Sequence, residues 1–219
     1  NGVKKFVAAG AGCGYPENAC IPLQEKDLWS GFPQFESSPY SLAKRLLTIQ
    51  SEAYHRQYNF NSIVCIPGNL YGPWDNFNLN DSHVIPGLIR KFVEAVQNDT
   101  DSVEVWGSGK ASRDFVYVSD VCLGMLQAAE HYDTHAVVNI SSGEEASIAK
   151  VVENLIEITK FKGAINWDTD KPEGQLRRKF DISKAQKDFG YKTEVDLVTG
   201  LKLTVDWFKA NQKDVNIRL

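Results

Sequence analysis

The sequence lacks an apolar run long enough to cross a bilayer, and its first residues do not have the pattern of a signal peptide. It also lacks an excess of positive charge, because the formal net charge is −4 and the pI is about 5.6. We therefore expect neither a membrane nor a nucleic acid as the main partner. An anionic substrate would need a local cluster of Arg and Lys.

Cysteine is scarce, and the four thiols have no CxxC spacing and no paired histidine. This argues against a zinc site, and we expect no metal ion in the protein. Cys65 lies inside an apolar run over 63–66, which predicts a small buried side chain. We expect a reduced, cytoplasmic protein. The four cysteines are Cys13, Cys20, Cys65 and Cys122.

A glycine-rich GxxGxxG turn after a first strand is also absent. Such a turn, with the helix N-terminus that follows it, holds the pyrophosphate of a bound dinucleotide. The glycines at Gly10, Gly12 and Gly14 follow a predicted strand, but their spacing differs from that pattern. If the protein binds a dinucleotide, we expect the pyrophosphate-binding segment to lie outside this sequence.

The composition is that of an ordinary globular protein, with 42% hydrophobic and 24% charged residues among 219. Hydrophobic periodicity predicts strands that alternate with helices of ten or more residues, which is typical of an α/β fold with a parallel sheet. Ser82 is expected to cap the helix that follows it. Strands are predicted over 3–9, 61–66, 103–106, 114–118, 137–140 and 164–167, and helices over 39–58, 82–96, 119–132, 147–159 and 196–208.

Tyr40 and Lys44 form the sharpest local feature, since residues four apart share one face of a helix. A phenol exchanges protons poorly at neutral pH unless its pKa is lowered, and a neighbouring ammonium lowers it by stabilising the phenolate. The pair alone is a weak signal, because many amphipathic helices place a Lys beside a core Tyr. Its context decides the interpretation.

That context is an ordered set of motifs. They are GAGCGYP over 10–16, YSLAK over 40–44, PGNLYGP over 67–73, DSHVIP over 81–86, VWGSG over 105–109, and RDFVYV over 113–118 followed by Asp120. In this order and spacing the sequence resembles the extended short-chain dehydrogenases that act on nucleotide sugars, the NAD-dependent epimerase/dehydratase family. The stretch DNFNLNDSHVIPGLIRKF over 75–92 resembles the GDP-L-fucose synthases in particular. The resemblance covers nearly the whole chain.

The resemblance implies a catalytic site. Tyr40 matches the catalytic acid, and Lys44 matches the partner that lowers its pKa and binds the nicotinamide ribose. Cys13 and His83 match an acid–base pair for epimerisation, which suits them because a thiol and an imidazole titrate near neutrality. The alternative is that neither residue is catalytic: Cys13 would be a small buried side chain, and His83 a surface residue at the start of a helix. The implied cofactor is NADP(H), with NAD(H) as the alternative, at Ala9, Gly10, Ala11, Gly12, Tyr40, Lys44, Pro67, Gly68, Asn69, Leu70 and His83.

A nucleotide-sugar substrate, with a GDP-sugar favoured, is implied as well. The guanidinium of Arg113 has the fork of donors that fits a diphosphate, and Trp106 can pack on the nucleotide. In this family the basic cluster at 177–179 flanks the nucleotide, and Arg178 is the residue of this cluster that we expect to bind it. The matched substrate-binding positions are Asn69, Lys91, Trp106, Arg113, Glu173 and Arg178.

The sequence departs from the family pattern in three ways. Ala11 occupies the position of the usual catalytic Ser, so Tyr40 would lack a neighbouring hydrogen-bond donor. Lys91 occupies a position where the better-known enzymes have Arg, although Arg90 is adjacent. Family members also carry a longer N-terminal part, so we expect this sequence to be a fragment or a partial sequence.

The implied fold is α/β: a doubly wound parallel sheet of Rossmann type without its first strands, and a small C-terminal α/β substrate lobe. The expected division is 1–77 with 110–142 for the dinucleotide-binding domain, and 78–109 with 143–219 for the substrate-binding lobe. The implied activity is NADPH-dependent 3,5-epimerisation and 4-reduction of a GDP-4-keto-6-deoxy-mannose-like substrate. A homodimer is expected through the helix at 40–58, which is the usual dimer helix of the class.

Two alternatives stay open. One is a nucleotide-sugar 4-epimerase of the same family, towards which the loss of the Ser tilts the balance. A 4,6-dehydratase fits less well, because those enzymes place an Asp-Glu pair where this chain has Gly12 and Cys13. The other is a non-catalytic module that binds a nucleotide sugar or a cofactor. Retention of Tyr40, Lys44, Cys13 and His83 together counts against it.

Overall fold

The computed structural model describes residues 2–171 and 173–213. The chain divides into two compact units, each built from separate stretches of sequence. The first unit comprises 1–70, 114–144 and 178–194, and the second comprises 71–113, 145–177 and 195–219. Among the described residues, no helix is both long and apolar enough to cross a membrane.

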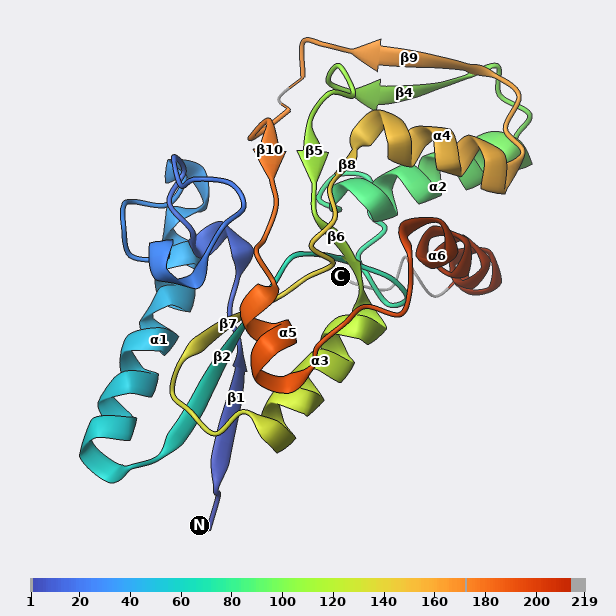
Figure 1. Ribbon diagram of the computed structural model, residues 1–219. Helices are drawn as coiled ribbons and strands as arrows, with labels where there is room; N and C mark the ends of the chain where they lie inside the picture. Colours follow the sequence, from blue (N-terminus) through green and yellow to red (C-terminus); the bar gives the residue numbers. More distant parts are fainter. Residues whose placement is uncertain (1, 172, 214–219) are drawn as a thin grey trace. The chain divides into compact units, whose positions relative to one another are not determined.

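The first unit is organised around a parallel sheet of order β1-β2-β7 (Figure 1). Helices α1 and α3 pack against this sheet, and α5 packs beside β7 and α3. This arrangement confirms the predicted α/β class. The elements of the sheet and its helices are β1 (Lys5–Ala9), α1 (Ser38–Tyr58), β2 (Asn61–Pro67), α3 (Val118–His131), β7 (Val137–Ile140) and α5 (Ser183–Phe189).

The core of this unit is formed where β2 and β7 meet the helices. Central strand β2 is buried from Ser62 to Pro67, whereas β1 leaves Phe6 51% exposed. The segment 178–194, expected in the C-terminal lobe, belongs to this unit instead because its aromatic residues enter the same core. The core residues include Ile63, Cys65, Val116, Val138, Ile140, Phe180, Ala185 and Tyr191.

Between β1 and α1 the chain makes a long excursion that contains three short 3-10 helices, η1 (Gly12–Gly14), η2 (Glu25–Asp27) and η3 (Phe35–Ser37). Three of its side chains, Tyr15, Leu23 and Leu28, are buried in the core of the first unit. The Tyr15 hydroxyl donates a 2.7 Å hydrogen bond to Asn139 Oδ1 on β7. The excursion is therefore packed onto the sheet.

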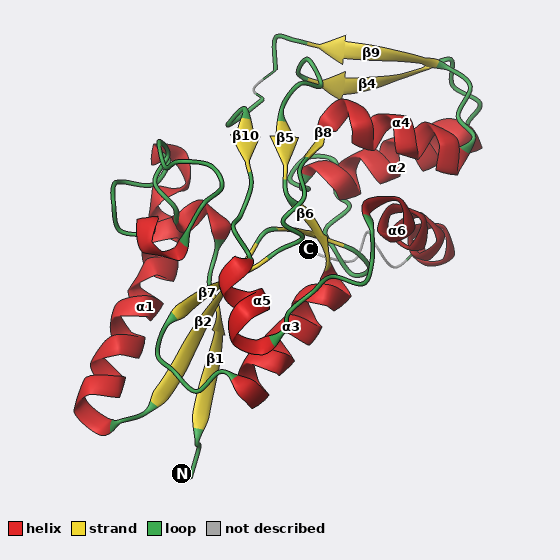
Figure 2. Cartoon of the chain, viewed as in Figure 1, coloured by secondary structure: helices red, strands yellow, loops and turns green. Residues whose placement is uncertain are grey.

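The second unit pairs β4 with β9 in parallel and packs three helices together (Figure 2). Its largest fully buried side chains include Phe77, Phe92, Leu155 and Leu201. The elements are α2 (Val84–Gln97), β4 (Ser102–Trp106), α4 (Ile148–Thr159), β9 (Ala164–Asp168) and α6 (Leu197–Asn211).

Short strands lie at or near the positions where the chain passes from one unit to the other. Sequence periodicity missed several of them because two or three residues are too few to show an alternation. The two sheets they form have the orders β3-β6 and β10-β5-β8. The strands are β3 (Asn69–Tyr71), β5 (Ser112–Arg113), β6 (Phe115–Tyr117), β8 (Ala146–Ser147) and β10 (Arg177–Arg178).

The predicted cap of α2 was wrong. The helix begins at Val84, with His83 in the N-cap position, and no side chain accepts a capping hydrogen bond there. Ser82 lies one residue too early to act as the cap. By contrast, Ser147 caps α4, because its hydroxyl accepts a 3.1 Å hydrogen bond from the Lys150 amide.

Candidate functional site

The first unit brings together Cys13, Tyr40 and Lys44. Lys44 Nζ donates a 2.8 Å hydrogen bond to the carbonyl oxygen of Ala9 and lies 5.7 Å from the centre of the Tyr40 ring. Tyr40 is 55% exposed, and Cys13 is partly buried in the turn after β1. The YxxxK spacing therefore places both side chains on the part of α1 that faces the end of β1.

The titration of Tyr40 differs from the expectation. Partial burial raises the pKa of its hydroxyl above the usual value, and the negative charge of a Cys13 thiolate raises that pKa further. The lowering by Lys44 stays a prediction: its ammonium lies 5.7 Å from the centre of the Tyr40 ring and donates to the Ala9 carbonyl oxygen. What the structure adds is an electrostatic coupling between the phenol and the thiol.

Arg178 interacts with the same thiol. Burial lowers the pKa of its guanidinium, and the charge of Cys13 opposes that shift. Arg178 belongs to the first unit, whereas Arg177 belongs to the second and binds both oxygens of Glu145, at 2.9 and 2.6 Å. The basic cluster expected as one group therefore divides between two sets of partners.

The turn at 67–70 is fixed by close packing. A Cβ added to Gly68 would lie 1.8 Å from Ser141 Oγ, so only glycine fits there. Asn69 donates to the Asp114 carbonyl oxygen through both its backbone amide, at 3.0 Å, and its side-chain amide, at 3.1 Å. Asn69 and Leu70 both belong to the short strand β3.

Asp114 explains why this turn is rigid. Its carboxylate is fully buried and accepts hydrogen bonds from Ser141, Ser142, Gly143 and Phe180. Burial nevertheless raises the pKa of the carboxyl group, against the opposing effect of these donors. Sequence reasoning treated Asp114 only as part of a motif, although an acidic residue at the start of an apolar run is the signal that could have found it.

Small residues line the approach to Tyr40 and Lys44. A Cβ on Gly10 would meet Val64 and Ile66 at 3.0 Å, and a Cβ on Gly12 would meet Phe180 at 2.6 Å. Ala11 starts η1, where its extended backbone precedes the turn that carries Cys13. Glycine at these two positions therefore lets the chain pack closely against Val64, Ile66 and Phe180.

The second unit contains a pocket of about 270 Å³ that gathers the remaining predicted residues. Lys91 comes from α2, Trp106 from the end of β4 and Arg113 from β5, while Glu173 follows β9. Several other residues that line the pocket were not predicted as site residues. Two of them, Val84 and Leu88, were expected only to share the apolar face of the helix. The lining is Leu79, Ser82, His83, Val84, Gly87, Leu88, Lys91, Val105, Trp106, Gly109, Ala111, Arg113, Ile148 and Glu173.

The cations of this pocket are held in place by main-chain carbonyls. Lys91 Nζ donates a 2.9 Å hydrogen bond to the Glu104 carbonyl and lies 5.7 Å from the Trp106 ring centre. Arg113 donates from Nη1 to the Ser112 carbonyl at 2.8 Å and from Nη2 to the Glu173 carbonyl at 3.2 Å. Lys171, which sequence reasoning missed, lies 5.5 Å from the same indole.

The carboxylate of Glu173 is anchored to the Gly107–Gly109 turn. It accepts a hydrogen bond from the Ser108 amide, and hydrogen bonds from Ser108 lower the pKa of the Glu173 carboxyl group. Gly107 and Gly109 have φ values of +82° and +77°, which glycine adopts without strain. The turn therefore fixes an ionised carboxylate at the pocket.

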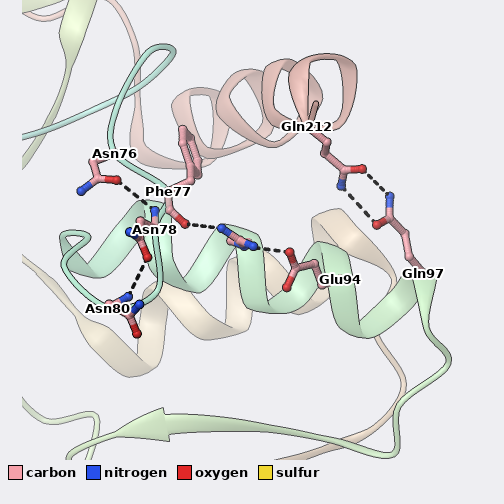
Figure 3. Close-up of polar contacts among 8 residues, drawn as sticks. Asn76, Phe77, Asn78, Asn80, Glu94, Gln97 and Gln212 are labelled. Carbon is pink, nitrogen blue, oxygen red and sulfur yellow. Dashed lines mark hydrogen bonds and ion pairs between the residues drawn. The ribbon is translucent and has the colours of Figure 1, made fainter. Parts of the chain in front are cut away.

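The loop that carries His83 is held by a second set of contacts, drawn in Figure 3. Asn76 Oδ1 accepts from the Asn78 amide at 3.0 Å, and Asn78 Oδ1 accepts from the Asn80 amide at 3.1 Å. Arg90 donates to the Phe77 carbonyl at 3.3 Å and to Glu94 at 2.7 Å. Arg90 therefore anchors this loop, and it is not among the residues that line the pocket beside Lys91.

The model of the NAD dependent epimerase/dehydratase family matches residues 1–141, well over half of the chain. The chain belongs to this family. Its fold is accordingly a Rossmann-type α/β fold, as expected from the motifs. The matched residues include both the YSLAK motif at 40–44 and the turn at 67–70.

Individual relatives are longer than this chain. GDP-L-fucose synthase 1 of Arabidopsis thaliana is 36% identical over 211 residues, which are 96% of the chain and 65% of the relative. The chain spans 63–65% of the length of three plant relatives. These relatives therefore match almost the whole of this chain, whereas the chain matches only part of each relative.

Solved structures agree with the family. A GDP-L-fucose synthetase from Naegleria fowleri bound to NADP gives a TM-score of 0.91 at 31% identity, over 97% of this chain and 68% of that one. A UDP-glucose 4-epimerase from Thermotoga maritima with UDP-glucose gives 0.83 at 28% identity, over 96% and 65%. The same fold therefore carries more than one nucleotide-sugar chemistry.

Proposed function

We propose that this protein is an NADPH-dependent nucleotide-sugar epimerase/reductase that epimerises C3 and C5 and reduces C4 of a GDP-4-keto-6-deoxy-mannose-like substrate. The observation that carries the proposal is the coupling of Tyr40 with Cys13 beside Lys44, since it places the groups for reduction next to one member of the proposed epimerisation pair. The other member, His83, belongs to the second unit. The similarity to GDP-L-fucose synthases supports it.

For the reduction, Tyr40 is the proton donor to the oxygen at C4. Its exposed hydroxyl lies at the start of α1, and Lys44 provides positive charge that favours the phenolate left after proton transfer. The cofactor supplies the hydride to C4 when bound. Ala11 offers no hydroxyl, so Tyr40 acts without the Ser that usually assists it.

For the epimerisation, Cys13 and His83 are the proposed acid–base pair. One removes the proton from the carbon next to the keto group, and the other returns a proton to the opposite face of the same carbon. A thiol and an imidazole suit these roles because both titrate near neutral pH. Arg178 interacts electrostatically with Cys13, because the charge of Cys13 opposes the lowering of the Arg178 pKa by burial.

The pocket of the second unit is the proposed site for the nucleotide part of the substrate. Lys91, Lys171 and Arg113 provide positive charge suited to a diphosphate, and the indole of Trp106, 52% exposed, offers a stacking surface. Glu173 and Asn69 are the proposed hydrogen-bonding partners. The anchored carboxylate of Glu173 can accept hydrogen bonds from a base, which is consistent with a guanine nucleotide.

NADP(H) is the proposed cofactor, and the residues present fit its nicotinamide end. The small residues Gly10 and Gly12, the ammonium of Lys44 and the closely packed turn at 67–70 would hold that end. Ala9, Ala11, Pro67, Gly68, Asn69, Leu70 and His83 complete the proposed contacts. The NADP-bound Naegleria fowleri structure supports the choice over NAD(H).

A nucleotide-sugar 4-epimerase is the second candidate. Ala11 in place of the usual Ser and the similarity to the Thermotoga maritima enzyme favour it. A non-catalytic binding module is a third, because the scaffold could bind a nucleotide sugar without turnover. The domain roles are proposed to follow the units, with the first binding the cofactor and the second binding the substrate.

A homodimer in the cytoplasm is the proposed state of the protein. The buried side of α1 consists of Ser38, Ser41, Arg45 and Ser51, while its apolar side chains face outward. Leu42, Leu46 and Ile49 are 40–52% exposed, which favours coverage by a second copy. The four free cysteines suit a reducing compartment.

Turnover by the complete natural protein decides among the candidates. GDP- and UDP-4-keto-sugars are supplied with NADPH, and product stereochemistry is read by NMR. Consumption of NADPH with inversion at C3 and C5 of the GDP-sugar is the expected result. Interconversion at C4 without net NADPH consumption would favour the 4-epimerase, and tight binding without turnover would favour the binding module.

A further inference from the structure

Arg45 links α1 to two distant points of the excursion that follows β1. It is only 4% exposed, whereas Tyr40 on the same helix is 55% exposed. Nε donates to the Gly14 carbonyl oxygen, and Nη1 donates to the Gly31 carbonyl oxygen at 2.9 Å. One guanidinium therefore holds both ends of a long loop against a single helix.

The side chains of Trp29 and Thr48 add further contacts around Arg45. The Trp29 ring centre lies 5.2 Å from Arg45 Cζ, close enough for a cation–π contact. Trp29 Nε1 donates to Thr48 Oγ1 at 3.3 Å, and Thr48 Oγ1 donates to the Arg45 carbonyl oxygen at 2.8 Å. The loop is thus fastened to α1 through both the side chain and the backbone of Arg45.

The arrangement is costly for a residue that served only to fill space. Burial lowers the pKa of the Arg45 guanidinium, and Nη2 is buried without a hydrogen-bond partner in the described part of the chain. An apolar side chain would avoid both penalties. The guanidinium offers something an apolar group lacks, namely donors in a planar fork that can reach two diverging carbonyls at once.

The bonded carbonyl of Gly14 belongs to the turn that carries Cys13. This turn is itself closed by a 2.9 Å hydrogen bond from the Gly14 amide to the Ala11 carbonyl. We propose that Arg45 is a positioning residue, which holds the Gly12–Gly14 turn and the Cys13 thiol at a fixed place against the helix that bears Tyr40 and Lys44. The consequence for catalysis rests on the proposed function, whereas the effect on the thiol does not.

The position of the Cys13 thiol matters for the chemistry of the site, because Cys13 interacts electrostatically with Tyr40. A thiolate at Cys13 raises the pKa of Tyr40, and such an effect depends on the distance between the two groups. Tyr40 and Lys44 are placed by α1 itself, but Cys13 is placed by a loop. Loss of Arg45 should therefore displace the thiol and leave the phenol and the ammonium where they are.

Alkylation of the thiols tests this placement without any assay of activity. Iodoacetamide is added to the wild type, Arg45→Met and Arg45→Lys, and each modified cysteine is quantified by peptide mass spectrometry. Exposed Cys20 serves as the internal reference, and fully buried Cys65 reports on the integrity of the core. In Arg45→Met we expect the ratio of the Cys13 rate to the Cys20 rate to rise by about fivefold or more, with Cys65 still protected, because the loop opens locally.

Arg45→Lys should give a ratio between those of the other two proteins, because a lysine retains the charge and can reach only one carbonyl. An Arg45→Met ratio within about twofold of wild type, with Cys65 protected, overturns the proposal. If Arg45→Met also exposes Cys65, Arg45→Lys decides: a raised ratio supports the role, and an unchanged ratio overturns it.

A second readout separates positioning from general loss of structure. In the complete natural protein, Arg45→Met should lower the exchange of sugar protons with deuterated water by about tenfold or more, and lower reduction of an already epimerised keto-sugar by less than about threefold. Equal losses in both steps would contradict a role directed at Cys13. If the wild type performs neither reaction, the proposed function fails while the alkylation ratio still decides the role of Arg45.

Discussion

The ammonium of Lys44 donates a 2.8 Å hydrogen bond to the main-chain carbonyl of Ala9, the last residue of β1. This bond ties α1 to the end of the parallel sheet and fixes the ammonium 5.7 Å from the centre of the Tyr40 ring. A phenol and an ammonium are thereby presented together at the carboxyl end of a strand, where open α/β sheets bind their ligands.

Replacement of Tyr40 by Phe should leave substrate binding nearly unchanged and lower turnover by about 10²–10⁴-fold, because it removes a proton donor and little volume. Steady-state kinetics and calorimetric binding of the nucleotide sugar measure the two effects. Tyr54→Phe is the matched control, since Tyr54 lies on the same helix and is 54% exposed. Near-normal turnover in Tyr40→Phe would remove Tyr40 from the mechanism.

Cys13→Ser or His83→Gln should stop exchange of the C3 and C5 protons with deuterated water. Hydride transfer to an already epimerised keto-sugar should survive, because it depends on Tyr40 and Lys44. Deuterium uptake is followed by NMR, with Cys20→Ser as the control for loss of an exposed thiol. Undiminished uptake in both variants would return Cys13 and His83 to structural roles.

Gly107→Ala should weaken nucleotide-sugar binding at the pocket of the second unit. Gly107 has φ +82°, and an added Cβ would lie 2.5 Å from Glu173 Cγ, so the carboxylate must move. Gly190→Ala is the control, because Gly190 has φ +72° with no atom within 4 Å of the added Cβ. Both variants should lose about 1 kcal/mol of stability or more from backbone strain.

Only Gly107→Ala should raise the dissociation constant of the nucleotide sugar, by about tenfold if one charge-assisted hydrogen bond is lost. Isothermal titration of both variants measures this difference. An equal change in the two, or none in either, would mean that the turn does not place Glu173 for binding.

The pH dependence of stability should reveal Asp114. Burial raises its pKa in the folded protein above the unfolded value near 3.8, so the folded state binds the proton more tightly. The corresponding stability is present below about pH 4 and is lost as the pH rises through the folded pKa. Urea unfolding of the wild type and Asp114→Asn between pH 3.5 and 7 should show that the stability of the wild type relative to the variant falls as the pH rises.

Asp196 provides a contrast of opposite sign. Hydrogen bonds from the Thr199 backbone lower the pKa of this N-cap carboxyl group. Its contribution is therefore present above the unfolded pKa and lost as the pH falls through the folded one. Asp196→Ala should remove about 1 kcal/mol of stability near neutral pH and less at acid pH. The same pH trend for both aspartates would contradict the assignment of Asp114.

Asp114→Asn should also destabilise the protein at every pH. An amide nitrogen in place of one carboxylate oxygen cannot accept from the donors that now surround it, either Ser141 and Ser142 or Gly143 and Phe180. Each buried donor left without a partner costs about 1–3 kcal/mol. A fully neutral substitution would show that these hydrogen bonds do not hold the turn.

Much of the fold was predictable because long elements carry a periodic pattern. The strand at 137–140 was predicted with its observed bounds, and most other long elements agreed within a few residues. Helix α5, with seven residues, and the two-residue strands were missed because they are too short to show a periodic pattern. The helix of Tyr40 shows a subtler difference, because its buried side consists of serines and Arg45 while Leu42 and Leu46 stay exposed.

The sequence by itself determined the order of the strands and helices, the shared helix face of Tyr40 and Lys44, and the motif positions of the remaining site residues, because each depends on spacing along the chain. The tertiary structure alone decided which side chains share a cavity and in which direction their pKa values shift. Lys91 and Glu173 meet at one pocket although far apart in sequence, and the pKa of Tyr40 rises because its hydroxyl is partly buried and Cys13 lies beside it. Burial and distance set those properties, and both arise only when segments distant in sequence pack together.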